Sequence, residues 1–171
     1  LDECFGSIKN NFNSDVSINR LKLQHGLGIP GLTNIFAAAL WGLDFMMEWY
    51  AMGGFQIYVD LNPIPTDFQS PLVSDNNFSG IVPVRVQPLY YAMLSIPVMI
   101  GGQFTTTKKV VFTKRPAANI KIWYWASEES DDKRVLIINK DLDHTLSGKV
   151  VICNGGNRKA TYYYLEASEL L

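Results

Sequence analysis

Residues 28–54, GIPGLTNIFAAALWGLDFMMEWYAMGG, decide the fold of this chain. A long apolar run begins just after Thr33 and Asn34, and both of these residue types are good helix N-caps. The run ends at Gly53 and Gly54, and glycine commonly follows the C-terminus of a helix. The pattern therefore predicts one long helix, capped by Thr33 or Asn34.

The predicted helix is apolar on almost every side, and its charged residues are Asp44 and Glu48. A helix of this kind must be buried inside a large body. A membrane span is the competing interpretation, but two acidic groups near the middle would be expensive in a bilayer. We therefore expect no membrane span. We expect the two acids, one helical turn apart, to pair with basic groups on a missing part of the protein rather than to form a catalytic dyad.

Apolar segments on either side of this helix have the character of β-strands. Residues 16–24, VSINRLKLQ, alternate apolar and polar side chains, as in a half-buried strand. Residues 55–61, FQIYVDL, are a short apolar run that reads as a buried strand. Strand, helix and strand together predict a βαβ unit, which normally belongs to a parallel sheet.

The following residues, 62–82, are rich in proline and asparagine and are expected to form a loop. Residues 88–100, PLYYAMLSIPVMI, predict a helix that begins at Pro88 and is ended or kinked by Pro97. One βαβ unit and one further helix cannot cover both faces of a parallel sheet. Missing chain or a partner polypeptide is therefore expected to supply the rest of this layer.

The pattern changes after Gly102. Five β-type runs follow, separated by turn-rich segments, at residues 108–112, 119–126, 134–139, 149–153 and 160–165. Short strands at this spacing favour an antiparallel sandwich. The predicted organisation is therefore α/β plus all-β, with an α/β part at 1–102 and an incomplete β-sandwich at 103–171.

Composition excludes several classes of protein. The net charge is −1, from 15 basic and 16 acidic residues, and neither sign forms a long block. This balance argues against a nucleic-acid or membrane-surface binder. Cys4 and Cys153 are too few for a disulfide framework; they can pair with each other, pair outside the chain or stay free. Two histidines and two cysteines without ligand spacing predict no metal site, and we expect no cofactor.

The glycines at 26, 28 and 31 fit the form G-x-G-x-x-G between a strand and a helix. However, the helix is expected to start at Thr33, beyond the third glycine, and Pro30 interrupts the turn. A β-rich domain then follows instead of further βαβ units. These features favour a plain βα loop over a dinucleotide-binding turn.

Three motifs in order resemble one family: residues 28–54, residues 88–94 (PLYYAML) and residues 134–142 (RVLIINKDL). They are similar to glycoside hydrolase family 79, the heparanases and β-glucuronidases. In that family a glycine-rich loop after the seventh barrel strand leads through a serine- or threonine-capped turn into a helix with a Phe-Ala-Ala-like run and a Leu-Trp pair. The resemblance covers about residues 16–165.

The resemblance implies the closing part of a (β/α)8 barrel followed by a β-sandwich, and hydrolysis of glucuronides with retention. That chemistry uses two carboxylates roughly 5 Å apart. The family's acid/base lies on an earlier strand that this chain does not contain, and its nucleophile is a glutamate ending strand seven. A match without gaps places Arg20 at the nucleophile position, and residues 16–43 contain no Asp or Glu. Arginine cannot form a glycosyl ester, so the family's catalytic step is not expected here.

Other residues are candidates for substrate contact. Asp60 ends the second predicted strand, near the family's pocket, either as a displaced catalytic carboxylate or as a loop cap. His25 lies at the mouth of the predicted barrel, where it contacts a sugar, acts on a proton or is simply solvated. Trp123 and Trp125 share one face of a strand, as a platform for glycans or as sandwich core. Asn77 begins a glycosylation acceptor, Asn-Phe-Ser.

Together these observations predict a non-catalytic relative of the glycoside hydrolases with a structural or glycan-binding role. Its expected location, implied by the family, is outside the cell or on its surface. Two alternatives stay open: an active glucuronidase-type hydrolase completed by missing chain or a partner, and a glycan-binding module. Because residue 1 is Leu rather than Met, we expect a mature product or a segment of a longer protein.

Overall fold

A computed structural model describes ten stretches of the chain. They are 17–22, 26–52, 54, 56–61, 64–74, 84–100, 108–109, 120–126, 133–141 and 160–167. The predicted strand at 149–153 lies outside them, as do Cys4 and Cys153.

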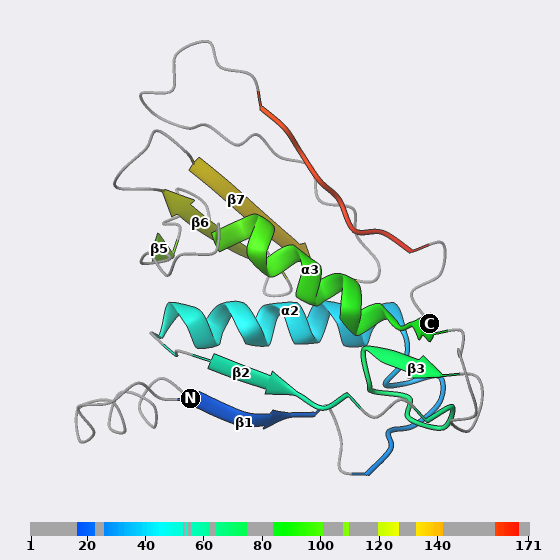
Figure 1. The fold of residues 1–171 in the computed structure, drawn as a ribbon. Helices are drawn as coiled ribbons and strands as arrows, with labels where there is room; N and C mark the ends of the chain where they lie inside the picture. Colours follow the sequence, from blue (N-terminus) through cyan, green and yellow to red (C-terminus); the bar gives the residue numbers. More distant parts are fainter. Residues whose placement is uncertain are drawn as a thin grey trace.

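Strands β1 (Ser17–Leu21) and β2 (Gln56–Val59) pair in parallel, and helix α2 (Phe36–Ala51) connects them (Figure 1). Ile18 lies opposite Ile57 in this pair. The predicted βαβ unit is therefore confirmed, and its apolar side chains Ile57 and Val59 pack against the core that surrounds α2.

The start of α2 differs from the prediction. Its N-cap is Ile35, and no side chain caps the first turn. Thr33 Oγ1 instead accepts from the Ile29 N–H at 2.9 Å and donates to the Ile29 carbonyl at 3.0 Å. Asn34 Oδ1 accepts from the Gly31 N–H at 2.7 Å. Both predicted caps are thus used by the preceding turn, and the prediction of a Thr33 or Asn34 cap is wrong.

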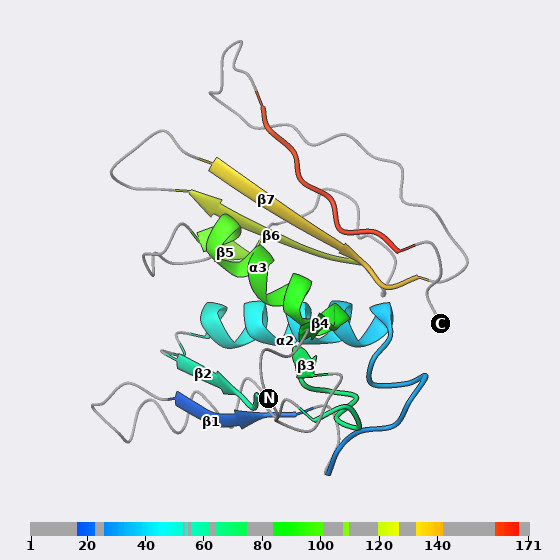
Figure 2. The ribbon, with the colours of Figure 1, turned by 45° about the vertical axis from the view of Figure 1, so that its right-hand side comes forward.

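Helix α3 (Pro88–Ile100) begins at Pro88 as predicted. It continues past Pro97 to Ile100, so Pro97 does not end the helix. It packs along α2 (Figure 2). The Leu89 side chain of α3 lies against Gly42 of α2, where a Cβ atom would collide with it. Among the described helices, none is both long enough and apolar enough to cross a membrane.

Two short strands lie within and after the stretch predicted as a loop. β3 (Leu72–Ser74) pairs antiparallel with β4 (Val84–Val86), which leads directly into α3. β3 is too short to show a period-2 pattern among the surrounding prolines, so its sequence gives no strand signal. The prediction of an uninterrupted loop over 62–82 is therefore wrong.

The second half of the chain contributes an antiparallel sheet in the order β5-β6-β7. Its strands are β5 (Lys108–Lys109), β6 (Ile120–Ala126) and β7 (Lys133–Asn139), and they fall within or close to three of the five predicted runs. Residues 160–165 were also predicted as a strand, but the structure places 160–167 outside any ladder. The complete barrel and the complete sandwich stay predictions.

α2 forms the middle layer of the described molecule. The pair β1–β2 covers one side of it, and α3 with the sheet β5–β7 covers the other (Figures 1 and 2). One hydrophobic cluster joins these layers and includes Leu21 of β1, Met47 of α2, Ile96 of α3, Trp123 of β6 and Ile138 of β7. The core therefore extends across the predicted boundary near residue 102.

The two acidic residues of α2, Asp44 and Glu48, pair with lysines in or next to the sheet β5–β7. Lys140 Nζ lies 2.5 Å from Asp44 Oδ2, and Lys121 Nζ lies 3.0 Å from Glu48 Oε1. Both acids were predicted to pair with basic groups on a missing part of the protein. The partners instead belong to this chain: Lys121 lies on β6, and Lys140 is the residue after β7.

Burial raises the pKa of the Tyr50 hydroxyl, near the end of α2, above its ordinary value of 10.0.

We expect Lys140→Ala to destabilise the fold by about 1–3 kcal/mol, because it leaves the mostly buried Asp44 carboxylate without its charged partner. Lys121→Ala is the matched control, since its pair with Glu48 is more exposed and is expected to contribute less than about 1 kcal/mol. Urea unfolding of both variants measures the difference. Equal losses of unfolding free energy would contradict this account.

Candidate functional site

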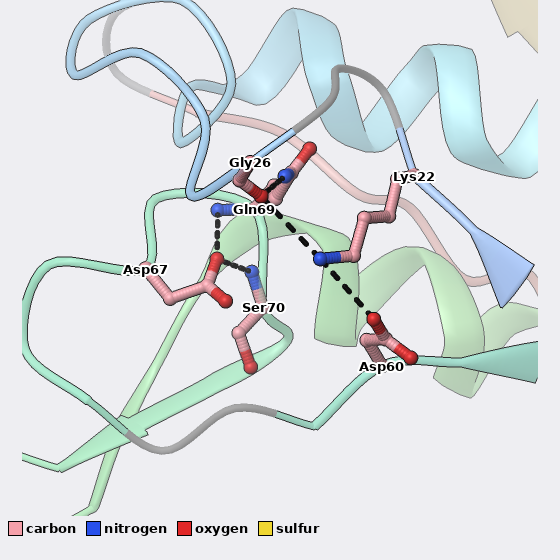
Figure 3. A network of polar contacts seen from close by, with 6 residues as sticks. All are labelled: Lys22, Gly26, Asp60, Asp67, Gln69 and Ser70. Atoms are coloured by element: carbon pink, nitrogen blue, oxygen red, sulfur yellow. Dashed lines mark hydrogen bonds and ion pairs between the residues drawn. The ribbon is translucent and has the colours of Figure 1, made fainter.

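The carboxyl ends of β1 and β2 carry a charged pair. Lys22 follows β1 and Asp60 follows β2, and Lys22 Nζ lies 3.1 Å from Asp60 Oδ2 (Figure 3). The two side chains are 22% and 30% exposed. The prediction placed Asp60 at a strand end, and the structure agrees. In (β/α)8 enzymes this end of the strands is the one that holds the active site.

A tight glycine loop follows Lys22. Gly26, Gly28 and Gly31 all have positive φ angles, between 73° and 85°, which favour glycine. The Lys22 ammonium group donates to the Gly26 carbonyl at 3.3 Å. The helix starts only at Phe36, so these glycines do not place a helix N-terminus against a pyrophosphate in the manner of a dinucleotide-binding turn. The geometry favours the plain βα loop.

A second loop, residues 64–71, holds the glycine loop in place (Figure 3). Gln69 Nε2 donates to the Gly26 carbonyl at 2.5 Å, and the Phe68 N–H donates to the Leu27 carbonyl at 2.8 Å. These contacts join segments about forty residues apart in sequence, since Gln69 and Gly26 differ by 43 positions. The loops at this end therefore form one connected polar network.

Asp67 organises the second loop. Its Oδ1 accepts from the Gln69 N–H at 3.1 Å and the Ser70 N–H at 3.0 Å. Gln87 Nε2 donates to the Asp67 carbonyl at 2.6 Å and thereby ties this loop to the start of α3. Asp67, Gln69 and Gln87 were not predicted as site residues. An aspartate whose side chain accepts from the backbone N–H groups two and three residues later forms an Asx turn. The sequence D-F-Q-S at residues 67–70, which lies between prolines, was the signal from which this turn could have been predicted.

Both described carboxylates near the carboxyl ends of β1 and β2 take part in structural contacts. Asp60 forms the ion pair with Lys22, and Asp67 is 1% exposed with one oxygen bonded to two backbone N–H groups. A retaining glycosidase needs two carboxylates facing one substrate, one as nucleophile and one as acid/base. The described residues present no such arrangement here. The observed contacts hold the two loops against the ends of β1 and β2.

The other predicted site residues fall in different places. Arg20, at the predicted nucleophile position, is the penultimate residue of β1. His25 and Asn77 lie outside the described residues. Trp123 is 2% exposed and belongs to the core, in agreement with the second of its two predicted roles, sandwich core rather than glycan platform. Trp125 lies on β6 opposite Arg134.

Within the part of the chain that the structure describes, no three His, Cys, Asp or Glu side chains come together as a metal site would require. A separate hollow of about 350 Å³ lies away from the ion pair. Its walls are the residues just before and at the start of α2, the junction of β4 with α3, and residues 165–167. It is lined mainly by apolar side chains, with Glu166 and Asn34 as polar members.

Gly28→Ala should destabilise the glycine loop more than Gly31→Ala. A side chain at either position is strained by the positive φ, at about 1–2 kcal/mol. A Cβ at Gly28 would also collide with Thr33 Oγ1, which two hydrogen bonds hold in place, whereas a Cβ at Gly31 meets nothing within 4 Å. We expect about 1 kcal/mol of additional loss for Gly28→Ala, measured by thermal unfolding. Equal melting temperatures would show that the loop is not held as described.

Comparison of the chain with models of known protein families and with curated proteins found no match.

Proposed function

We propose that this chain is the closing part of a glycoside hydrolase-like barrel that performs no glycosidic cleavage by itself. Its role is then structural or glycan-binding, in an assembly that supplies the other strands. The observation that carries the proposal is the Lys22–Asp60 ion pair at the ends of β1 and β2. β1 itself contains Arg20, at the position that the family resemblance gives to the nucleophile.

The chemistry of retention supports this proposal. The first step attaches the sugar to a carboxylate oxygen, and the second releases it with water activated by the other carboxylate. A guanidinium group has no oxygen for the first step and no nucleophilic lone pair at ordinary pH, because it stays protonated. Asp60 has the required carboxylate oxygens, but one of them, Oδ2, lies 3.1 Å from the Lys22 ammonium group and is engaged in an ion pair.

The shape of the described part also favours a partner. A parallel pair of strands is normally covered on both faces. Here Ile57 and Val59 face the core around α2, whereas Tyr58, between them, is about half exposed. Further polypeptide beside β1–β2 would bury that face. An extracellular location, which rests on the family resemblance, and a glycan at Asn77, which rests on the Asn-Phe-Ser motif, belong to the same proposal.

The runner-up function is an active glucuronidase-type hydrolase that missing chain or a partner completes. It is favoured by the position of Asp60, since this carboxylate lies where barrel enzymes keep their catalytic groups. In that case Asp60 would have to serve as the displaced nucleophile.

Purified chain is expected to release no 4-nitrophenol from 4-nitrophenyl β-D-glucuronide, and Asp60→Asn is expected to leave this result unchanged. The substitution should lower the unfolding free energy by less than about 1 kcal/mol, because the pair is partly exposed. An active β-glucuronidase serves as the positive control. Turnover by the wild-type chain that disappears in Asp60→Asn would overturn the proposal and support the hydrolase.

A further inference from the structure

Three consecutive tyrosines stand in solvent near the C-terminal end of the described chain. Tyr162, Tyr163 and Tyr164 are 82%, 76% and 73% exposed. The rings of Tyr162 and Tyr164 lie on one side of the segment, with centroids 6.4 Å apart and planes inclined by only 23°. Large aromatic side chains gathered in solvent are typical of binding surfaces rather than of ordinary exteriors.

The same segment leads directly into the hollow described above. Residues 165–167, which follow Tyr164, form one of its walls. Phe36 and Pro88 contribute apolar surface, and Tyr91 contributes an aromatic ring that is half exposed. An aromatic pair in solvent and a concave pocket with its own aromatic wall therefore adjoin each other on one short stretch of chain.

The geometry points to a binding site for a neutral saccharide, formed by the stacked Tyr162–Tyr164 pair and the adjoining pocket. A pyranose ring presents a face of C–H groups that packs on an aromatic ring, while its hydroxyl groups project from the rim. Tyrosine suits such a ligand because it combines an apolar face with a polar hydroxyl group. Asn34 and Glu166, at the pocket, offer an amide and a carboxylate to sugar hydroxyl groups. This inference rests on the proposed glycan-binding role and specifies its site.

The charge of the pocket selects the kind of glycan. Among the described residues that line it, none is Lys or Arg, and Glu166 is the charged side chain. An acidic polysaccharide would bring its carboxylates or sulfates toward that side chain, and none of these described lining residues offers a compensating cation. The site therefore favours uncharged sugars over uronic-acid or sulfated chains. A cationic ligand such as an amino sugar is the competing class, since one carboxylate could attract it.

A glycan array carrying neutral, acidic and amino-sugar oligosaccharides tests this inference with the full chain. Wild-type protein is expected to bind neutral oligosaccharides. The Tyr162→Ala/Tyr164→Ala double variant is expected to lose about tenfold or more in apparent affinity, in line with two aromatic contacts. Tyr163→Ala is the matched control, because it removes an equally exposed tyrosine of the same segment that is not part of the ring pair. Circular dichroism melting checks that each variant stays folded.

The inference is overturned if neutral glycans do not bind, if acidic glycans or amino sugars bind in preference to them, or if the double variant binds like wild type. These outcomes differ from failure of the proposed function. Turnover of a glucuronide by the same protein would end the non-catalytic proposal whatever the array shows. Neutral-glycan binding that survives the double substitution would keep the glycan-binding role and reject only this site.

Discussion

Burial of α2 is the constraint on which the rest of the described structure depends. Its sequence offers no polar face, and residues such as Ala39, Leu43 and Met47 are almost fully inaccessible to solvent. A helix of this composition is stable only when other elements cover it from several directions. The β1–β2 pair, α3 and the sheet β5–β7 provide this cover, which explains why one cluster of side chains connects strands from both halves of the chain.

The main elements could be predicted because their signals are local. The apolar run of α2, the alternating strand before it and Pro88 at the start of α3 each reflect a rule that acts over a few residues. The N-cap prediction failed because the side chains of Thr33 and Asn34 can either cap a helix or bond to the backbone of the preceding turn. They accept hydrogen bonds from the Ile29 and Gly31 N–H groups, and the sequence pattern did not indicate that turn. β3 escaped prediction because its ladder partner β4, not its own sequence, makes it a strand.

The candidate site was predictable only in part, for a related reason. The position of Asp60 follows from the end of a strand, which the sequence indicates. Its partner Lys22 follows from the parallel register of β1 and β2, which the sequence does not define. The bond from Gln69 to Gly26 depends on two loops meeting across 43 positions of chain. The burial of Trp123 likewise depends on which face of β6 meets α2, and alternation within the strand leaves that choice open.

The two ion pairs between α2 and the upper sheet have a consequence for the geometry of the whole layer. Apolar contacts are non-directional, so a sheet resting on a uniformly apolar helix could shift along it or rotate over it with little change in buried area. Asp44 and Glu48 lie one turn apart on α2; Glu48 meets Lys121 of β6, and Asp44 meets Lys140, which directly follows β7. Two separated anchor points define both the translation and the angle of one layer on the other. The two ion pairs thus favour one position of the sheet on α2, in addition to the preference set by the packing of apolar side chains.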